Sequence, residues 1–63
     1  SISVNEAYAI LNCKQGDSRE KIESNYKKLM LKLHPDKNKD IDSTKICQIL
    51  TEAKDLIIKT DFS

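Results

Sequence analysis

The stretch YKKLMLKLHPDKN, residues 26–38, decides how this chain folds, because an amphipathic helical pattern runs into a residue that must end it. Pro35 has no backbone N–H and disfavours the helical region for the residue before it. The helix should therefore end at His34, and the chain should turn away as a loop. We expect His34, Pro35 and Asp36 to form a stiff, exposed corner that displays an imidazole and a carboxylate.

The helical pattern of this stretch extends upstream and predicts a helix over about residues 18–33. Asp17 and Glu20 have the spacing of a capping box at its start. One face of this helix gathers the apolar residues that should enter the core, which are Ile22, Tyr26, Leu29 and Leu33. On the opposite face, one apolar side chain, Leu31, is surrounded by basic ones, which are Lys21, Lys27, Lys28 and Lys32.

Two further helices are predicted, one before and one after this helix in the sequence. Ser3 and Glu6 have the spacing of a second capping box, at the start of a short helix over about residues 4–12 with Tyr8 and Leu11 on its core face. After a polar loop, either Asp42 or Ser43 can cap a third helix over about residues 43–59. Its apolar stripe should pack against the second helix and contains Ile46, Leu50, Ala53 and Ile57. The predicted fold class is all-α, a small helical domain in which the short first helix packs across an antiparallel helix pair.

Size and composition fit a single domain over residues 1–63. A chain of 63 residues with 38% hydrophobic side chains can build one modest core but no deep substrate cavity, so we expect no enzyme activity. No stretch approaches the roughly 18 consecutive apolar residues of a membrane span, and the first residues lack the layout of a secretory signal. Ser1 in place of an initiator Met predicts a processed or excised fragment.

The two cysteines, Cys13 and Cys47, have a spacing that fits no zinc pattern. They can be small half-buried apolar residues, or, in an oxidising compartment, a disulfide. A zinc site that used both thiols and His34 would still lack a fourth protein ligand. We therefore expect no metal and no cofactor.

The whole pattern resembles the J domain of DnaJ-type co-chaperones. The resemblance rests on Tyr8-Ala9-Ile10-Leu11, on the apolar positions from Ile22 to Leu33, on the triplet His34-Pro35-Asp36, and on Glu52-Ala53 with Leu56-Ile57. It covers nearly the whole chain and implies a J-domain fold without a fourth helix. It also implies docking on the ATPase domain of a DnaK-type heat-shock chaperone, stimulation of its ATP hydrolysis, and thereby capture of client polypeptides in protein folding or translocation.

The resemblance assigns roles to individual residues. It implies that His34, Pro35 and Asp36 are the chaperone-stimulating motif, and that the chaperone-docking face consists of Lys27, Lys28, Leu31, Lys32 and Lys37. Scattered lysines give a long-range attraction that speeds encounter, whereas a fixed carboxylate can make a short charge-assisted bond to a guanidinium. Asp36 should therefore specify the partner, and the lysines should steer it.

Five residues of the helix pair depart from the usual pattern of the family. Glu23 and Ser24 stand where many members carry basic residues, so the first part of the docking face should carry less positive charge and docking should be weak. Asn25 stands on the core-facing flank where Ala is frequent, Cys47 stands near a position where Phe is common, and Lys54 follows Ala53 where an aromatic residue often stands. These last three replacements predict a helix pair that is less tightly packed than is usual.

Within the family, several segments are similar to the short J proteins of the mitochondrial presequence-import motor. They are Glu6-Ala7, Ile10-Leu11-Asn12, Lys28-Leu29-Met30-Leu31, Thr44-Lys45-Ile46 and Glu52-Ala53-Lys54-Asp55-Leu56. That similarity implies a J-like regulatory partner and a membrane anchor outside the fragment. Asn38 and Lys39 depart from it, because that type usually has small residues there. A cytosolic or endoplasmic-reticulum J protein fits nearly as well, so the compartment stays open, with cytoplasm and mitochondrion favoured.

Two other functions compete with this interpretation. A J-like scaffold could bind a partner J protein without activating a chaperone, but scaffolding alone gives no reason for an intact His34-Pro35-Asp36. A basic helix can also lie along nucleic-acid phosphates. The chain has one Arg, no aromatic residue among its outward lysines and a net charge of +1, so we expect no nucleic-acid partner.

Overall fold

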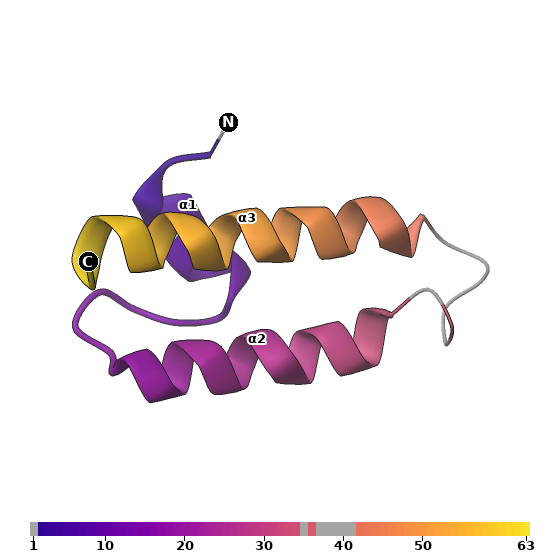
Figure 1. The fold of residues 1–63 in the computed structure, drawn as a ribbon, viewed down its shortest axis with the longest axis horizontal. Coiled ribbons are helices and arrows are strands. Elements are labelled where there is room, and N and C mark those ends of the chain that lie inside the picture. Colours follow the sequence, from indigo (N-terminus) through magenta and orange to yellow (C-terminus); the bar gives the residue numbers. More distant parts are fainter. Residues whose placement is uncertain (1, 35, 37–41) are drawn as a thin grey trace.

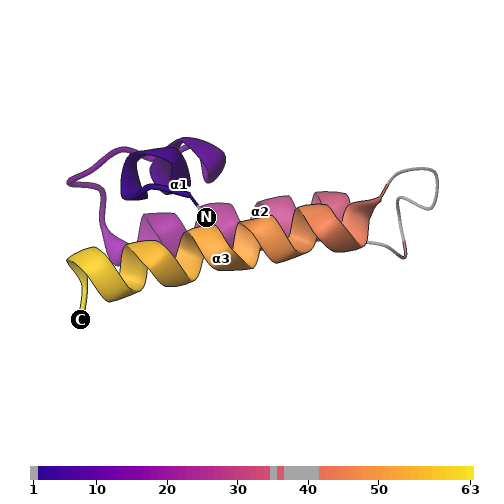
Figure 2. The ribbon, with the colours of Figure 1, turned by 90° about the horizontal axis from the view of Figure 1, so that it is seen from above.

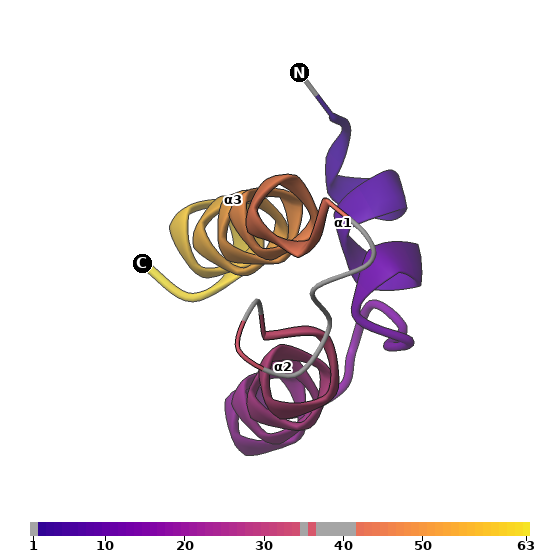
Figure 3. The ribbon, with the colours of Figure 1, turned by 90° about the vertical axis from the view of Figure 1, so that its right-hand side faces the viewer.

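Three helices make up the fold in a computed structural model that describes residues 2–34, 36 and 42–63. They are α1 (Val4–Ile10), α2 (Arg19–Leu33) and α3 (Ser43–Asp61), and no strand occurs among the described residues. The predicted all-α fold is confirmed. Figure 1 shows α2 and α3 side by side and antiparallel, and in the end-on view of Figure 3 α1 runs crosswise beside them.

Helix α1 covers only part of the helix pair. Both α1 and α2 pack directly against α3. In Figure 2, α1 lies over the half of the pair where α2 begins and α3 ends. Among the described residues, only α2 and α3 form the other half, where α2 ends and α3 begins.

Local hydrogen bonds fix the start of α1 as the sequence predicts. The Ser3 hydroxyl accepts from the Glu6 backbone N–H at 3.2 Å, and the Glu6 carboxylate accepts from the Ser3 N–H at 3.0 Å. The bond from the Ser3 backbone lowers the pKa of Glu6 below its usual value. Helix α1 ends at Ile10, earlier than expected, because Asn12 adopts a left-handed conformation with φ 55°.

The cap of α2 is Ser18, and the prediction of Asp17 was wrong. The Ser18 hydroxyl accepts from the Lys21 N–H at 3.1 Å. The Asp17 carboxylate instead accepts from the backbone N–H of Lys14 at 2.8 Å, a bond that lowers the pKa of Asp17. It closes the turn around Gly16, whose φ of 96° suits a residue without a side chain.

Helix α3 resolves the choice between two caps and is longer than expected. Asp42 is the cap, and its carboxylate accepts from the Lys45 N–H at 3.4 Å. The helix continues to Asp61, whose carboxylate accepts a hydrogen bond of 2.5 Å from the Tyr8 hydroxyl. This contact ties the last turn of α3 to α1.

The core is concentrated in the half of the molecule that α1 covers. Its buried apolar residues are Ala7, Tyr8, Leu11, Cys13, Ile22, Leu50, Ala53 and Ile57. Four other residues expected in the core are half-buried and pack at its edge, namely Tyr26, Leu29, Leu33 and Ile46. Three packed helices exclude water more completely than two, which explains why the side chains near the corner are less buried. In the part of the chain that the structure describes, no helix is long and apolar enough to cross a membrane.

Candidate functional site

The predicted corner begins where α2 ends. Helix α2 stops at Leu33, and His34 has the extended backbone angles φ −59° and ψ 140° that are favoured before a proline. Pro35 itself lies outside the described residues. His34 and Asp36 are therefore the two members of the triplet whose geometry can be stated.

His34 and Asp36 contact each other through one ring nitrogen. The backbone N–H of Asp36 donates to Nδ1 of His34 at 3.2 Å, and a carboxylate oxygen of Asp36 lies 3.6 Å from the same atom. Nδ1 can accept the N–H only when it carries no proton, and a protonated Nδ1 would turn to the carboxylate. The contact with the ring restrains the Asp36 backbone, while 91% of the Asp36 side chain remains exposed.

A chain of hydrogen bonds links this end of α2 to α3. The Thr51 hydroxyl donates to the Cys47 carbonyl oxygen at 3.0 Å and lies 3.1 Å from the Tyr26 hydroxyl, which is therefore the donor to Thr51. The Cys47 thiol, a weak donor, lies 3.7 Å from the Leu33 carbonyl oxygen, next to His34. These bonds fix the register of α2 on α3 where the apolar core is thin.

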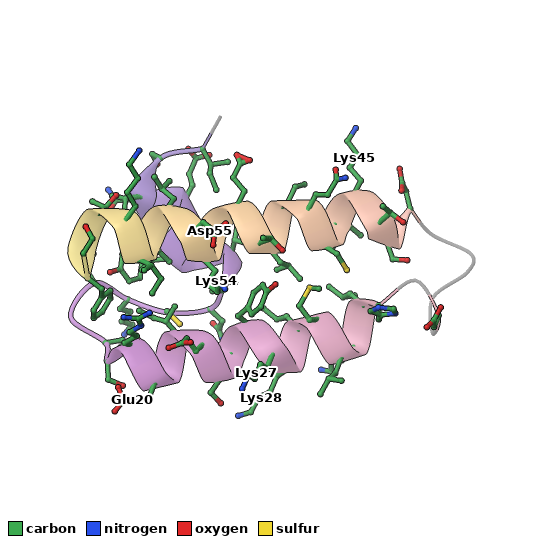
Figure 4. All side chains as sticks on the ribbon, in the orientation of Figure 1. Glu20, Lys27, Lys28, Lys45, Lys54 and Asp55 are labelled. Carbon is green, nitrogen blue, oxygen red and sulfur yellow. The ribbon has the colours of Figure 1, made fainter. Side chains whose placement is uncertain are left out.

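Lys54 supports the same region from α3. Its ammonium nitrogen lies 4.8 Å from the centroid of the Tyr26 ring, a distance at which a cation is attracted to the aromatic face. Figure 4 shows Lys54 pointing from α3 toward α2. The cation thus packs on the aromatic ring, a contact that the sequence did not indicate.

The expected docking face lies on the side of α2 that points away from α3. Lys27 and Lys28 project from this side in Figure 4 and are exposed, as are Lys32 and Leu31, whose exposed fraction is 64%. Lys37, the fifth expected member, lies outside the described residues. The structure therefore brings four of the five residues onto one exposed surface.

Positive charge on α2 is concentrated toward the corner. At the start of the helix, Arg19 lies 3.2 Å from Glu23 and Lys21 lies 3.3 Å from Asp17, so carboxylates offset both cations. Among the described residues, no carboxylate lies within ion-pair distance of Lys27 or Lys28. Such a surface attracts an acidic partner toward the half of α2 that leads to His34.

Asn25 has a structural role that the sequence did not reveal. Its side-chain amide donates to the carbonyl oxygens of Leu11 at 3.0 Å and Asn12 at 3.2 Å, and lies 3.3 Å from the Cys13 sulfur. Its position on the core-facing flank was the only signal in the sequence. Cys13 is buried against this link, Cys47 is half-buried, and both thiols are free.

The comparisons with known proteins agree with this geometry. A family model described as the DnaJ domain matches residues 6–61, which includes all three helices from the first turn of α1 onward. Comparisons with curated proteins and with solved structures returned no match.

Proposed function

Because this chain belongs to the DnaJ domain family, we propose that it stimulates ATP hydrolysis by a DnaK-type heat-shock chaperone through the corner at His34 and Asp36. Family membership makes the chain a J-domain co-chaperone with a partner of this type.

The observation that carries the proposal is the contact between His34 and Asp36. Nδ1 of His34 holds the Asp36 backbone at 3.2 Å, while the carboxylate stays almost fully exposed. An exposed carboxylate on a restrained backbone loses little conformational freedom when it bonds to a partner cation. This small loss of conformational entropy favours Asp36 as the group that recognises the chaperone.

The lysines of α2 supply a different part of the interaction. Lys27, Lys28 and Lys32 are exposed on long, flexible side chains. Exposed charges of this kind raise the rate of encounter with an acidic surface but contribute little to fixing a single geometry. We propose that these lysines steer the chaperone toward the domain and that Asp36 activates the chaperone.

The proposed activation needs no bond chemistry in this chain. By binding one conformation of the chaperone better than another, the domain shifts the chaperone toward the state that hydrolyses ATP. Differential binding can shift that equilibrium only by as much as the two affinities differ. The domain then acts as an activator in client capture, during protein folding or translocation, and not as an enzyme.

The test is single-turnover ATP hydrolysis by a DnaK-type chaperone, with and without the domain. We expect wild type to accelerate hydrolysis and Asp36→Asn to abolish the acceleration, because the neutral amide lacks the negative charge that attracts a partner cation. Asp55→Asn makes the same chemical change at an exposed position on α3 and should stimulate like wild type. Equal stimulation by Asp36→Asn and Asp55→Asn would refute the assigned role of Asp36.

A further inference from the structure

The end of α2 beside the corner has little apolar core to hold it. Ile22, in the first turn of α2, is buried, whereas Leu29 and Leu33 closer to the corner are half-buried. Apolar contacts are non-directional, so a thin apolar seam does little to prevent one helix from rotating or sliding on the other. The orientation of His34 and Asp36 therefore depends on directional contacts between α2 and α3.

Thr51 on α3 is at the centre of these contacts. Its hydroxyl donates to the Cys47 carbonyl oxygen at 3.0 Å and lies 3.1 Å from the Tyr26 hydroxyl of α2. A hydroxyl has one proton, so the bond to Cys47 makes Tyr26 the donor to Thr51 and fixes the direction of both bonds. Tyr26 and Thr51 are half-buried, which limits the competition of water for these bonds.

Two further contacts hold the same helices together. The Lys54 ammonium nitrogen lies 4.8 Å from the centroid of the Tyr26 ring, and the Cys47 thiol lies 3.7 Å from the Leu33 carbonyl oxygen. Tyr26 and Leu33 are about two helical turns apart, so α3 holds α2 at two separate points. The Leu33 carbonyl belongs to the planar peptide group that leads into His34. Contacts that orient this group also orient the start of the corner.

We propose that Thr51 is a positioning residue for the corner, because its hydroxyl joins Tyr26 of α2 to the backbone of α3 and thereby sets the orientation in which α2 presents Asp36 to the chaperone. The inference rests on the proposed function and adds to it a residue that acts through α2. A charge-assisted hydrogen bond is short and directional, so a displacement of the carboxylate by about 1 Å would lose most of it.

A purely structural role for Thr51 predicts a different result. A variant that only lost stability would lower the folded fraction of the domain and raise the apparent dissociation constant in proportion. Its folded molecules would still activate the chaperone fully once they saturate it. A positioning role instead lowers the rate of hydrolysis at saturation, while the docking lysines keep the half-maximal concentration unchanged.

The test is a titration of a DnaK-type chaperone with wild type, Thr51→Val and Thr51→Ser under single-turnover conditions. Valine has the shape of threonine without the hydroxyl, so we expect the saturating rate to fall about fivefold, the effect of one lost hydrogen bond, at an unchanged half-maximal concentration. Thr51→Ser keeps the hydroxyl and should restore the rate. Thr60→Val makes the same change at an exposed position near the end of α3 and should behave like wild type.

Tyr26→Phe provides a second test, because it removes the other hydroxyl of the bond and keeps the ring on which Lys54 packs. It should lower the saturating rate in the same way, and it decides alone if Thr51→Val does not fold. The double variant should lose no more than Thr51→Val, because both lack the same bond.

The inference would be overturned by additive losses in the double variant or by a Thr51→Ser domain that does not restore the rate. An unchanged saturating rate with a raised half-maximal concentration would overturn it in favour of a structural role. Wild type and Thr51→Val that stimulate equally would remove only the role of Thr51, whereas a folded wild type that does not stimulate would overturn the proposed function itself.

Discussion

The side-chain amide of Asn25 donates a hydrogen bond of 3.0 Å to the carbonyl oxygen of Leu11, the residue that caps the end of α1. Carbonyl oxygens at the end of a helix lack partners within the helix and need them elsewhere. Asn25 supplies one from the middle of α2 and thereby fixes α1 relative to α2. A polar side chain at the edge of the core therefore joins two elements that are not packed directly on each other.

Replacement of Asn25 tests this link. Asn25→Ala removes the amide donor to the Leu11 and Asn12 carbonyls and leaves the Leu11 carbonyl only the weak Cys13 thiol as a donor, so we expect the free energy of unfolding to fall by about 1–3 kcal/mol. Chemical denaturation followed by circular dichroism measures the change. Ser24→Ala removes a polar group from an exposed neighbour and is the control. Equal stabilities of the two variants would show that the Asn25 bonds contribute nothing.

The hydrogen bond between Tyr8 and Asp61 predicts a loss of stability in alkali. Burial, followed by the hydrogen bond to the Asp61 carboxylate, raises the pKa of Tyr8 to about 12 from a usual value of 10.0. A folded-state pKa above the unfolded one stabilises the fold fully below pH 10, and this stabilisation is lost as the pH rises toward 12. Tyr8→Phe cannot ionise and lacks the bond, so it should be less stable than wild type by about 1 kcal/mol at neutral pH. Denaturation should show this difference shrinking above about pH 10, whereas a constant difference would contradict the assignment.

His34→Gln should impair stimulation of the chaperone without unfolding the domain. The variant replaces the ring nitrogen that holds the Asp36 backbone with an amide on a flexible side chain, so stimulation of hydrolysis should fall about tenfold or more. His34 is half exposed, with 50% of its side chain accessible, so the thermal midpoint should change little. Normal stimulation by a folded His34→Gln would show that the ring does not position Asp36.

The steering role of the lysines predicts a change in salt dependence. Lys28→Glu with Lys32→Glu should slow association with the chaperone about tenfold at low salt and flatten the dependence of its rate on ionic strength. Lys45→Glu with Lys59→Glu changes the net charge equally at exposed positions on α3, and Lys45 points away from α2 in Figure 4. Stopped-flow association rates compare the two. The same salt profile for both variants would refute steering by α2.

Features set by nearby residues could be predicted from the sequence. The capping box of Ser3 and Glu6, the end of α2 before Pro35 and the apolar stripes of the helices each depend on contacts within a few residues. The placement of His34 and Asp36 at an exposed corner followed from the same local rules. Pro35 and Lys37, which complete the predicted triplet and docking face, lie outside the described residues.

Features that depend on distant contacts could not be predicted. One local contact was missed as well: the Asp17 carboxylate closes the turn with the Lys14 N–H, and the Ser18 hydroxyl caps α2. The last turn of α3 is tied to Tyr8, a residue far away in the sequence. The half-burial of the residues near the corner depends on how far α1 reaches along the pair. The short length of α1 indicates that it covers only part of the pair, but the part that it covers is evident only from the structure.

The most direct measurement is a titration of a DnaK-type chaperone with the domain under single-turnover conditions, which separates the saturating rate from the concentration for half-maximal effect. We expect Asp36→Asn to lower the saturating rate to the unstimulated one, because the substitution removes the activating contact. Replacement of Lys27, Lys28 and Lys32 by Gln should keep that rate and only raise the half-maximal concentration. An Asp36→Asn domain that reaches the wild-type rate at high concentration would contradict the claim that the corner activates the chaperone.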